Sequence, residues 1–358
     1  MDISNVIYYS DCRYFRGDVP CKPHKLDGRH CSICPSYSKT ESKILIIKLG
    51  AIGDVIRTSP LLTKIWQEHP NSDIWWLTYS PEVVPSKVDR IHKFNAENLL
   101  TLEATEFDLI INLDKDPHAC ALTKILNAKR KIGFTLEHGK PSPIDNQAVP
   151  KFITGLFDDV NQENDKNYLQ EIFEICGWEF HGEEYILEFD NSNIWEIQNE
   201  NKKIIGLNTG CGARWVSRLW DNKYWIELIK QLKDNGYYPL LLGGEQEHAN
   251  NILLSSLSGA YYPGFFNLQK FISLMNQCDC IVSAVTMGMH IAIGLKKPLI
   301  LMNNIFNPNE FELYGRGEIV QPEMLCKCFF SPKCKNNDYF CMDTIKPESI
   351  FEAIKKYV

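Results

Sequence analysis

The acidic residue Asp54 lies in a turn after a strand-like segment, which is a suitable place for a catalytic group. The stretch KILIIKLGAIGDVIRTSPLL, residues 43–62, runs from an apolar, strand-like segment into a glycine-punctuated turn that ends on Gly53 and Asp54. An acid in a strand–turn–helix at the carboxyl edge of a sheet is well placed to take a proton from a bound hydroxyl. The alternative is that Asp54 only caps a helix that begins near Val55, since a carboxylate there accepts free amide hydrogens.

The same turn argues against a dinucleotide site. Such a site needs the pattern G-x-G-x-x-G and an acidic residue at the end of the next strand. Here only Gly50 and Gly53 are present, and the next strand ends in WWLTYSPE without an acid at its tip. The sequence therefore disfavours NAD as a ligand.

Two further turns suit the binding of phosphate. LNTGCGARWVSRLW, residues 207–220, follows an apolar strand and combines small residues with a cation, Arg218. Small residues let backbone amides approach a phosphate, and a guanidinium binds one bidentately. The alternative places Arg218 on a solvated helix face. In SAVTMGMHIAIGL, residues 283–295, Thr286 opens a helix that carries His290 in its first turn. This helix start favours anion binding.

Thirteen cysteines are distributed in a way that favours metal sites. In a cytosolic chain clustered thiols suit a closed zinc or iron site better than disulfides. His24 or His30 is an alternative ligand for either of the first two cysteines, and unligated thiols remain the alternative for all. The two clusters are Cys12, Cys21, Cys31 and Cys34 near the start, and Cys326, Cys328, Cys334 and Cys341 near the end. The others, Cys120, Cys176, Cys211, Cys278 and Cys280, are interpreted as packing residues.

Strand and helix patterns alternate in both halves of the chain. Such alternation predicts parallel sheets covered by helices, with ligands at the carboxyl ends of the strands. We expect an α/β protein of two Rossmann-like doubly wound domains facing a cleft, with cysteine-rich terminal segments. The expected parts are a cysteine-rich segment (1–42), an N-terminal Rossmann-like domain (43–182), a linker (183–202), a C-terminal Rossmann-like domain (203–324), and a cysteine-rich segment with a final helix (325–358).

Composition limits the classes of function. The 358 residues are 44% hydrophobic and 23% charged, which is typical of a soluble protein. No apolar run reaches the length of a membrane span, and MDISNVIYYSDCRYF lacks the layout of a signal peptide. We therefore expect a cytoplasmic protein with at most peripheral contact with the inner membrane. A net charge of −7 argues against a nucleic-acid partner.

Five motifs that occur in a particular order allow a more specific interpretation of the fold and function. ILIIKLGAIGDVIRTSPLL, NTGCGARWVSRLW, LLLGGEQEH, TMGMHIAIGLKKPLI and FELYGRG occur in this order between residues 43 and 317. Together they resemble glycosyltransferase family nine, the heptosyltransferases that use ADP-heptose. The terminal cysteines are similar to those of a cysteine-bearing subgroup, which includes transferases that modify autotransporter proteins. The resemblance implies the GT-B architecture, with an acceptor domain at 43–182 and a nucleotide-sugar domain at 203–324. It also implies an inverting transferase without a catalytic metal.

The resemblance also implies roles for particular residues. Asp54 matches the general base, and Glu247 the acid that contacts the nucleotide ribose. The remaining positions match groups that bind the diphosphate of an ADP-sugar: Thr209, Gly210, Arg218, Thr286, Met287, Gly288 and His290.

Two departures from the family's sequence pattern leave alternatives open, and so does the nature of the acceptor. Family members commonly read Asp-Thr-Gly where this chain has Val285-Thr286-Met287, and Arg218 stands where a lysine is usual. The acceptor is a glycan, a lipid-linked molecule such as a lipopolysaccharide core, or a protein. Val285 favours a competing hypothesis, a non-catalytic nucleotide-sugar sensor or scaffold, whereas Asp54 opposes it. A metal-finger nucleic-acid binder is a weaker alternative.

Overall fold

The computed structural model describes residues 3–193, 195–212, 214–324 and 326–358. Its contacts divide the chain into two compact units. Unit 1 comprises Met1–Gly50, Ser59–Val149 and Glu174–Trp178. Unit 2 comprises Ala51–Thr58, Pro150–Phe173 and Glu179–Val358. The turn that carries Asp54 therefore belongs with the second unit, although it follows a strand of the first.

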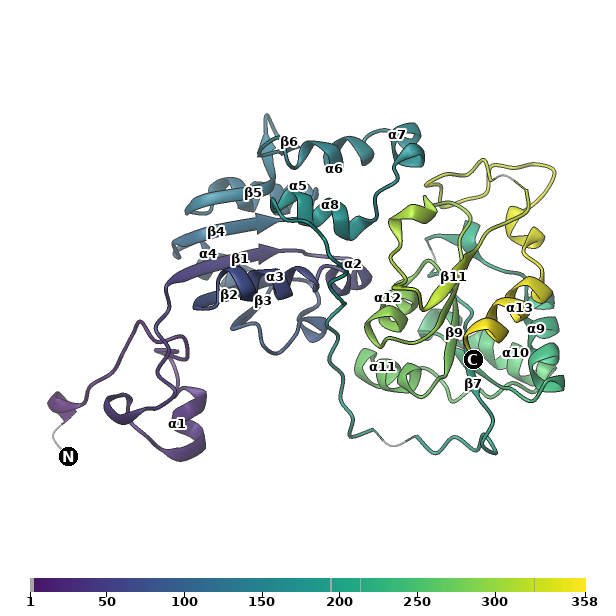
Figure 1. The fold of residues 1–358 in the computed structure, drawn as a ribbon, viewed down its shortest axis with the longest axis horizontal. Coiled ribbons are helices and arrows are strands. Elements are labelled where there is room, and N and C mark those ends of the chain that lie inside the picture. Colours follow the sequence, from purple (N-terminus) through teal and green to yellow (C-terminus); the bar gives the residue numbers. More distant parts are fainter. Residues whose placement is uncertain (1–2, 194, 213, 325) are drawn as a thin grey trace. The chain divides into compact units, whose positions relative to one another are not determined.

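Unit 1 is built on a mostly parallel six-stranded sheet (Figure 1). Its order is β3-β2-β1-β4-β5-β6, and only the β5–β6 pair is antiparallel. Every residue of β2 is buried, as expected for a central parallel strand. The strands are β1 (Ser42–Ile47), β2 (Ser72–Thr78), β3 (Arg90–Lys93), β4 (Phe107–Asn112), β5 (Ala128–Glu137) and β6 (Lys140–Pro143).

The helices of unit 1 follow its strands. They are α3 (Leu61–Glu68), α4 (Ala96–Glu103) and α5 (Pro117–Ile125). A core that includes Leu45, Trp75 and Phe107 fills the space between sheet and helices. Helix α5 ends at Ile125, because Ala128 already pairs with Phe107 in the sheet.

Unit 2 contains a second sheet, whose five strands are all parallel (Figure 1). Its order is β11-β10-β9-β7-β8, so the strand order reverses beside β7. Such a switch point is where doubly wound sheets bind ligands. The strands are β7 (Ile204–Asn208), β8 (Tyr238–Leu242), β9 (Cys280–Ala284), β10 (Leu299–Met302) and β11 (Gly317–Val320).

The helices of this half cover the second sheet. They are α9 (Asn222–Asp234), α10 (His248–Ser258), α11 (Leu268–Asn276), α12 (Met287–Gly294) and α13 (Pro347–Tyr357). The short helix α2 (Ile52–Ile56) packs against α12. Three more helices, α6 (Val149–Thr154), α7 (Asp158–Glu163) and α8 (Tyr168–Ile175), lie between β6 and residue 179. The expected pair of doubly wound sheets is confirmed.

The terminal segments are built differently. Near the N-terminus, η1 (Ile3–Asn5), α1 (Lys22–Asp27) and η2 (Cys31–Ile33) bury none of their residues. This part is attached to the sheet by polar contacts: Arg13 Nη2 donates to Asp89 over 2.8 Å, and Arg90 donates to the carbonyl of Phe15 over 2.9 Å. Among the described residues, none of the helices combines the length and apolar character needed to cross a bilayer.

Candidate active site

A cavity of about 800 Å³ in unit 2 brings most of the predicted residues together. Three turns line it, one after each of β7, β8 and β9, and α2 adds a fourth wall. These turns follow neighbouring parallel strands, so they meet at one edge of the sheet. The predicted residues that line this cavity are Asp54, Gly210, Arg218, Glu247, Thr286, Met287, Gly288 and His290.

Asp54 is held from two sides in the first turn of α2. Its Oδ2 accepts the amide hydrogen of Ala51 over 3.2 Å, and its Oδ1 lies 2.9 Å from Nε of Arg57. The helix begins at Ile52 rather than near Val55, so Asp54 is its third residue and not its N-cap. About a third of the Asp54 side chain is exposed, and it faces the cavity. Its capping contact therefore does not prevent contact with a ligand.

Arg57, which sequence reasoning missed, links two carboxylates. Its Nη1 lies 2.8 Å from Oε1 of Glu310, and its guanidinium is 3.6 Å from the ring centre of Tyr168. Burial lowers the pKa of Arg57, but the charges of Asp54 and Glu310 outweigh that effect and raise it overall. Arg57 is thus a permanent cation that orients Asp54. The three-residue spacing between Asp54 and Arg57 could have indicated their ion pair from the sequence. Nothing in the sequence indicates the contact with Glu310.

Arg218 is a buried cation. It ends the short helix η4 (Val216–Arg218) and is 7% exposed, so the interpretation of a solvated helix face is wrong. Its Nη2 donates to the carbonyl of Cys211 over 3.1 Å, and its guanidinium lies 5.4 Å from the ring centres of Trp215 and Phe306. Burial lowers its pKa to about 10, so it stays charged at neutral pH.

No carboxylate balances that charge within the described residues. No acidic group among them lies within ion-pair distance of Arg218, and its buried Nε has no hydrogen-bond partner there. A buried charge without a counter-charge is costly. The arrangement therefore favours an anionic ligand at this position.

The turn between β9 and α12 presents backbone amides. Thr286 is the N-cap of α12, and its Oγ1 accepts the amide hydrogen of Gly288 over 3.1 Å, as the sequence predicted for a helix start here. Asn208 Nδ2 donates to the same hydroxyl over 3.1 Å. A Cβ atom at Gly288 would lie 2.8 Å from the Asn208 side chain, so glycine lets strand and helix approach.

His290 lies buried one turn into α12 and is not a cation. Burial lowers its pKa to about 3, an effect to which the charge of Arg57 adds. Its Nδ1 is 3.4 Å from the hydroxyl of Tyr185. A Cβ at Gly53 would collide with the imidazole, so the glycine beside Asp54 lets α2 pack directly on His290. A neutral imidazole can donate only one hydrogen bond to a ligand.

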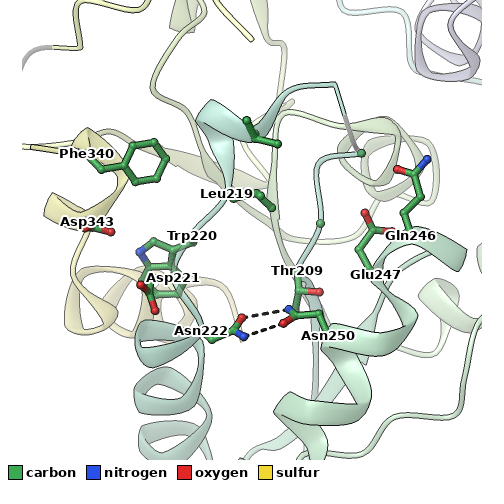
Figure 2. A pocket seen from close by; sticks show the side chains of 13 residues that line it. Thr209, Leu219, Trp220, Asp221, Asn222, Gln246, Glu247, Asn250, Phe340 and Asp343 are labelled. Atoms are coloured by element: carbon green, nitrogen blue, oxygen red, sulfur yellow. Dashed lines mark hydrogen bonds between the residues drawn. The ribbon is translucent and has the colours of Figure 1, made fainter. Parts of the chain in front are cut away.

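Glu247 and Thr209 lie around the Gly210 turn. Glu247 accepts the amide hydrogen of Gly244 over 2.9 Å, and a Cβ at Gly210 would collide with its side chain. Thr209 lines a different cavity of about 590 Å³, whose walls also include Gly210 and Glu247 (Figure 2). The Thr209 hydroxyl donates to Asn251 over 2.6 Å, so it supports the turn from within the protein.

The second cavity is closed on one side by a pair of amides. Asn222 at the start of α9 and Asn250 in α10 exchange two hydrogen bonds of 2.7 and 3.1 Å (Figure 2). Its charged lining residues are all acidic, namely Asp221, Glu247 and Asp343. Of the two cavities, only the one lined by Arg218 has the charge to bind phosphate.

The cysteines of the N-terminal cluster all line one small cavity of about 30 Å³, whereas His24 and His30 do not. In the C-terminal cluster Cys328 and Cys334 have their Sγ atoms 3.8 Å apart, and a hydrogen bond from Cys326 lowers the pKa of Cys341. All are free thiols. In the described residues, however, no group of three or more potential ligands is arranged to hold a metal ion, so metal binding is not shown.

The fold and site define the class of protein. Two Rossmann-like parallel sheets with a ligand cavity at the carboxyl edge of the second are the architecture of GT-B glycosyltransferases. Residues 99–336 match the family model of glycosyltransferase family 9 (heptosyltransferase). The chain belongs to this family of glycosyltransferase enzymes.

Curated relatives are heptosyltransferases. Lipopolysaccharide heptosyltransferase 1 of Pseudomonas aeruginosa is 20% identical over 301 residues, which cover 77% of this chain and 82% of that protein. Lipopolysaccharide heptosyltransferase 2 of Escherichia coli K12 is 29% identical over 124 residues. That match spans 33% of this chain and only 35% of the E. coli enzyme.

Solved structures share the fold at low identity. A family 9 glycosyltransferase of Veillonella parvula has a TM-score of 0.70 at 15% identity, covering 89% of this chain and 97% of its own. E. coli heptosyltransferase WaaC, solved with ADP, has a TM-score of 0.60 at 15% identity, covering 88% and 100%. The iron-containing dodecameric glycosyltransferase TibC of E. coli H10407 has a TM-score of 0.56 at 15% identity, covering 89% and 77%.

Proposed function

We propose that this protein is an inverting glycosyltransferase that moves a heptose, or a related sugar, from an ADP-sugar to an acceptor hydroxyl. One observation carries the proposal: the buried, uncompensated cation Arg218 lines the same cavity as Asp54. The first supplies a place for a diphosphate, and the second a base beside it. The acceptor hydroxyl belongs to a glycan, a lipopolysaccharide core or a protein.

The donor is bound through its diphosphate. Arg218 and the Met287 amide at the start of α12 donate to phosphate oxygens, and neutral His290 adds one hydrogen bond. Glu247 accepts from the ribose hydroxyls, and Gly210 leaves room for the Glu247 side chain beside this turn. The WaaC relative solved with ADP supports a nucleotide diphosphate in this fold.

Asp54 acts as the general base. Its carboxylate takes the proton of the acceptor hydroxyl while that oxygen forms a bond to the anomeric carbon, on the face opposite the departing ADP. The bond from the anomeric carbon to the phosphate oxygen breaks, and its electron pair leaves with the ADP. Arg218 and the Met287 amide stabilise the charge that develops on the leaving group. Arg57 keeps Asp54 oriented.

Mass spectrometry tests the reaction. The purified chain is incubated with ADP-heptose, alone and with lipopolysaccharide core, glycan or peptide acceptors. We expect release of ADP and a product heavier by one heptose, with slow hydrolysis when no acceptor is present. Tight binding of ADP-heptose without turnover on any acceptor would instead support the sensor hypothesis, which Val285 favours.

We also propose structural zinc or iron at the cysteine clusters, as hypothesised from the sequence. The iron-containing relative TibC and the pairing of Cys328 with Cys334 support a thiolate site near the C-terminus. Cys326 and Cys341 would complete it. The N-terminal cavity lined by four cysteines has the volume of a single ion or water. Thiolates in such sites stabilise the segment and leave no open position for substrate.

Metal content checks this proposal. Elemental analysis of protein purified without a metal-affinity tag should find one or two equivalents of zinc or iron. Replacing Cys328 and Cys334 by serine should remove one equivalent, because each loses a thiolate ligand, whereas serine at buried Cys278 and Cys280 should not change the content. Protein that is folded, active and free of both metals would contradict the proposal.

A lipid-linked acceptor would bring the enzyme to a membrane surface. We therefore include peripheral contact with the inner membrane, from the cytoplasmic side, in the proposed function.

A further inference from the structure

A cavity of about 650 Å³ in unit 1 is strongly basic. It lies between the N-terminal segment and the loop that precedes β3. One acidic residue, Asp89, lines it together with six cationic residues: Arg13, Arg16, Lys22, Lys25, Lys87 and Arg90. The whole chain carries a net charge of −7, so this concentration of positive charge is local.

Two of the six cations hold the wall of the cavity together. Arg13 makes a two-pronged contact with Asp89, of 2.5 and 2.8 Å, and is only 18% exposed. Arg90 donates to the carbonyl of Phe15 and lies 3.6 Å from Asp73. The Asp89 and Phe15 contacts join the N-terminal segment to β3 and the loop before it, so the cavity is a defined part of the fold.

The other cations are available to a ligand. Lys22, Lys25 and Lys87 are exposed, and none of them forms an ion pair with a carboxylate in the described part of the chain. Lys87 lies over the ring of Trp66, at 4.0 Å from its centre. Arg16 pairs only with exposed Asp18, over 3.2 Å. Like charges that gather around one cavity repel each other, and an anion with several oxygens would relieve that repulsion.

Exposed apolar side chains accompany these cations. Val19, which lines the cavity, is 53% exposed, and Leu26, next to Lys25 in α1, is 77% exposed. Ile7 in the same segment is 53% exposed. Cations mixed with exposed apolar side chains are the combination that binds anionic membrane surfaces, because headgroup phosphates and acyl chains are met together. A small soluble anion would leave the apolar side chains in water.

We propose that this face of unit 1 binds the phosphate headgroups of anionic phospholipids. This face would be the surface that makes the peripheral membrane contact of the proposed function. In that respect the proposal rests on the proposed function. The cavity lies at the amino end of β3, and the parallel strands β1 and β4 end at the opposite edge of the sheet. Membrane contact there leaves the carboxyl edge of this sheet accessible.

Vesicle sedimentation tests the proposal on the full chain. Vesicles of phosphatidylcholine alone are compared with vesicles that also contain phosphatidylglycerol, at low and high salt. We expect binding to the anionic vesicles only, weakened by salt because surface charges are screened. Changing Lys22, Lys25 and Lys87 together to glutamine should weaken this binding on the order of a hundredfold, since each lysine near an anionic surface contributes about fivefold.

A matched control removes the same charge elsewhere. Lys140, Lys230 and Lys270 are exposed and lie on β6, α9 and α11, and none of them lines the cavity. Their change to glutamine should leave vesicle binding within about twofold. Circular dichroism confirms that both triple variants are folded; if the cavity variant is not, Lys22→Gln with Lys25→Gln alone is measured and should lose about thirtyfold.

Three results would overturn the proposal. They are equal binding to neutral and anionic vesicles, equal losses in the two triple variants, and binding of inorganic phosphate or pyrophosphate to the cavity without binding to anionic vesicles. The readout does not use sugar transfer. A chain that binds vesicles but transfers no sugar would refute the proposed reaction and leave this surface standing.

Discussion

Asp54→Asn should lower turnover by about 10²- to 10⁴-fold while the affinity for ADP stays within about twofold. Asparagine keeps the size of the side chain and can still accept from the Ala51 amide, but it cannot take a proton from the acceptor. The groups assigned to the diphosphate come from other turns, at Arg218 and at the start of α12. Initial rates with saturating ADP-heptose and calorimetry with ADP measure the two effects separately.

A near-normal rate for this variant would mean that Asp54 serves only the helix start. Arg57→Lys provides a comparison, because lysine keeps the positive charge near Glu310 but not the two-sided contact of the guanidinium. If Arg57 positions the base, this variant should lose kcat with little change in KM or in the melting temperature. Equal losses of rate and stability would indicate a purely structural role.

Arg218→Ala should weaken ADP binding by about ten- to a hundredfold, the contribution of a hydrogen bond to a charged group. The folded protein should not be destabilised by loss of an ion pair, since in the described residues Arg218 has no carboxylate partner. Calorimetry with ADP gives the dissociation constant, and the thermal midpoint gives the stability.

Two variants sharpen this result. Arg218→Lys restores the residue that is usual in the family and should recover part of the affinity, because lysine binds phosphate as a point charge. Lys230→Ala, on the exposed face of α9, should leave the dissociation constant unchanged. If the Arg218→Ala protein binds ADP normally, the diphosphate does not bind at this part of the cavity.

Much of the fold follows from local sequence patterns. Short apolar runs such as residues 44–47 and 280–284 became buried parallel strands, and Thr286 caps a helix as a threonine before a helical pattern should. Turns that follow such strands share one sheet edge, which is why residues far apart in sequence could be assigned to one site.

Other features depend on tertiary contacts. The ion pair of Arg57 with Glu310 joins residues 253 positions apart, and no local pattern encodes it. The neutrality of His290 comes from burial under α2, which spacing along a helix does not reveal. The helix expected near Val55 begins three residues earlier because Asp54 also satisfies the amide of Ala51.

The assignment of Ala51–Thr58 to unit 2 has a practical consequence for protein engineering. A fragment cut at residue 203, where the second set of strands begins, would contain every group assigned to ADP but not Asp54. Exchanging N-terminal halves between relatives would likewise replace the base together with the helix that packs on His290. A functional chimera should therefore keep residues 51–58 from the same parent as α12, whatever the origin of the surrounding sheet.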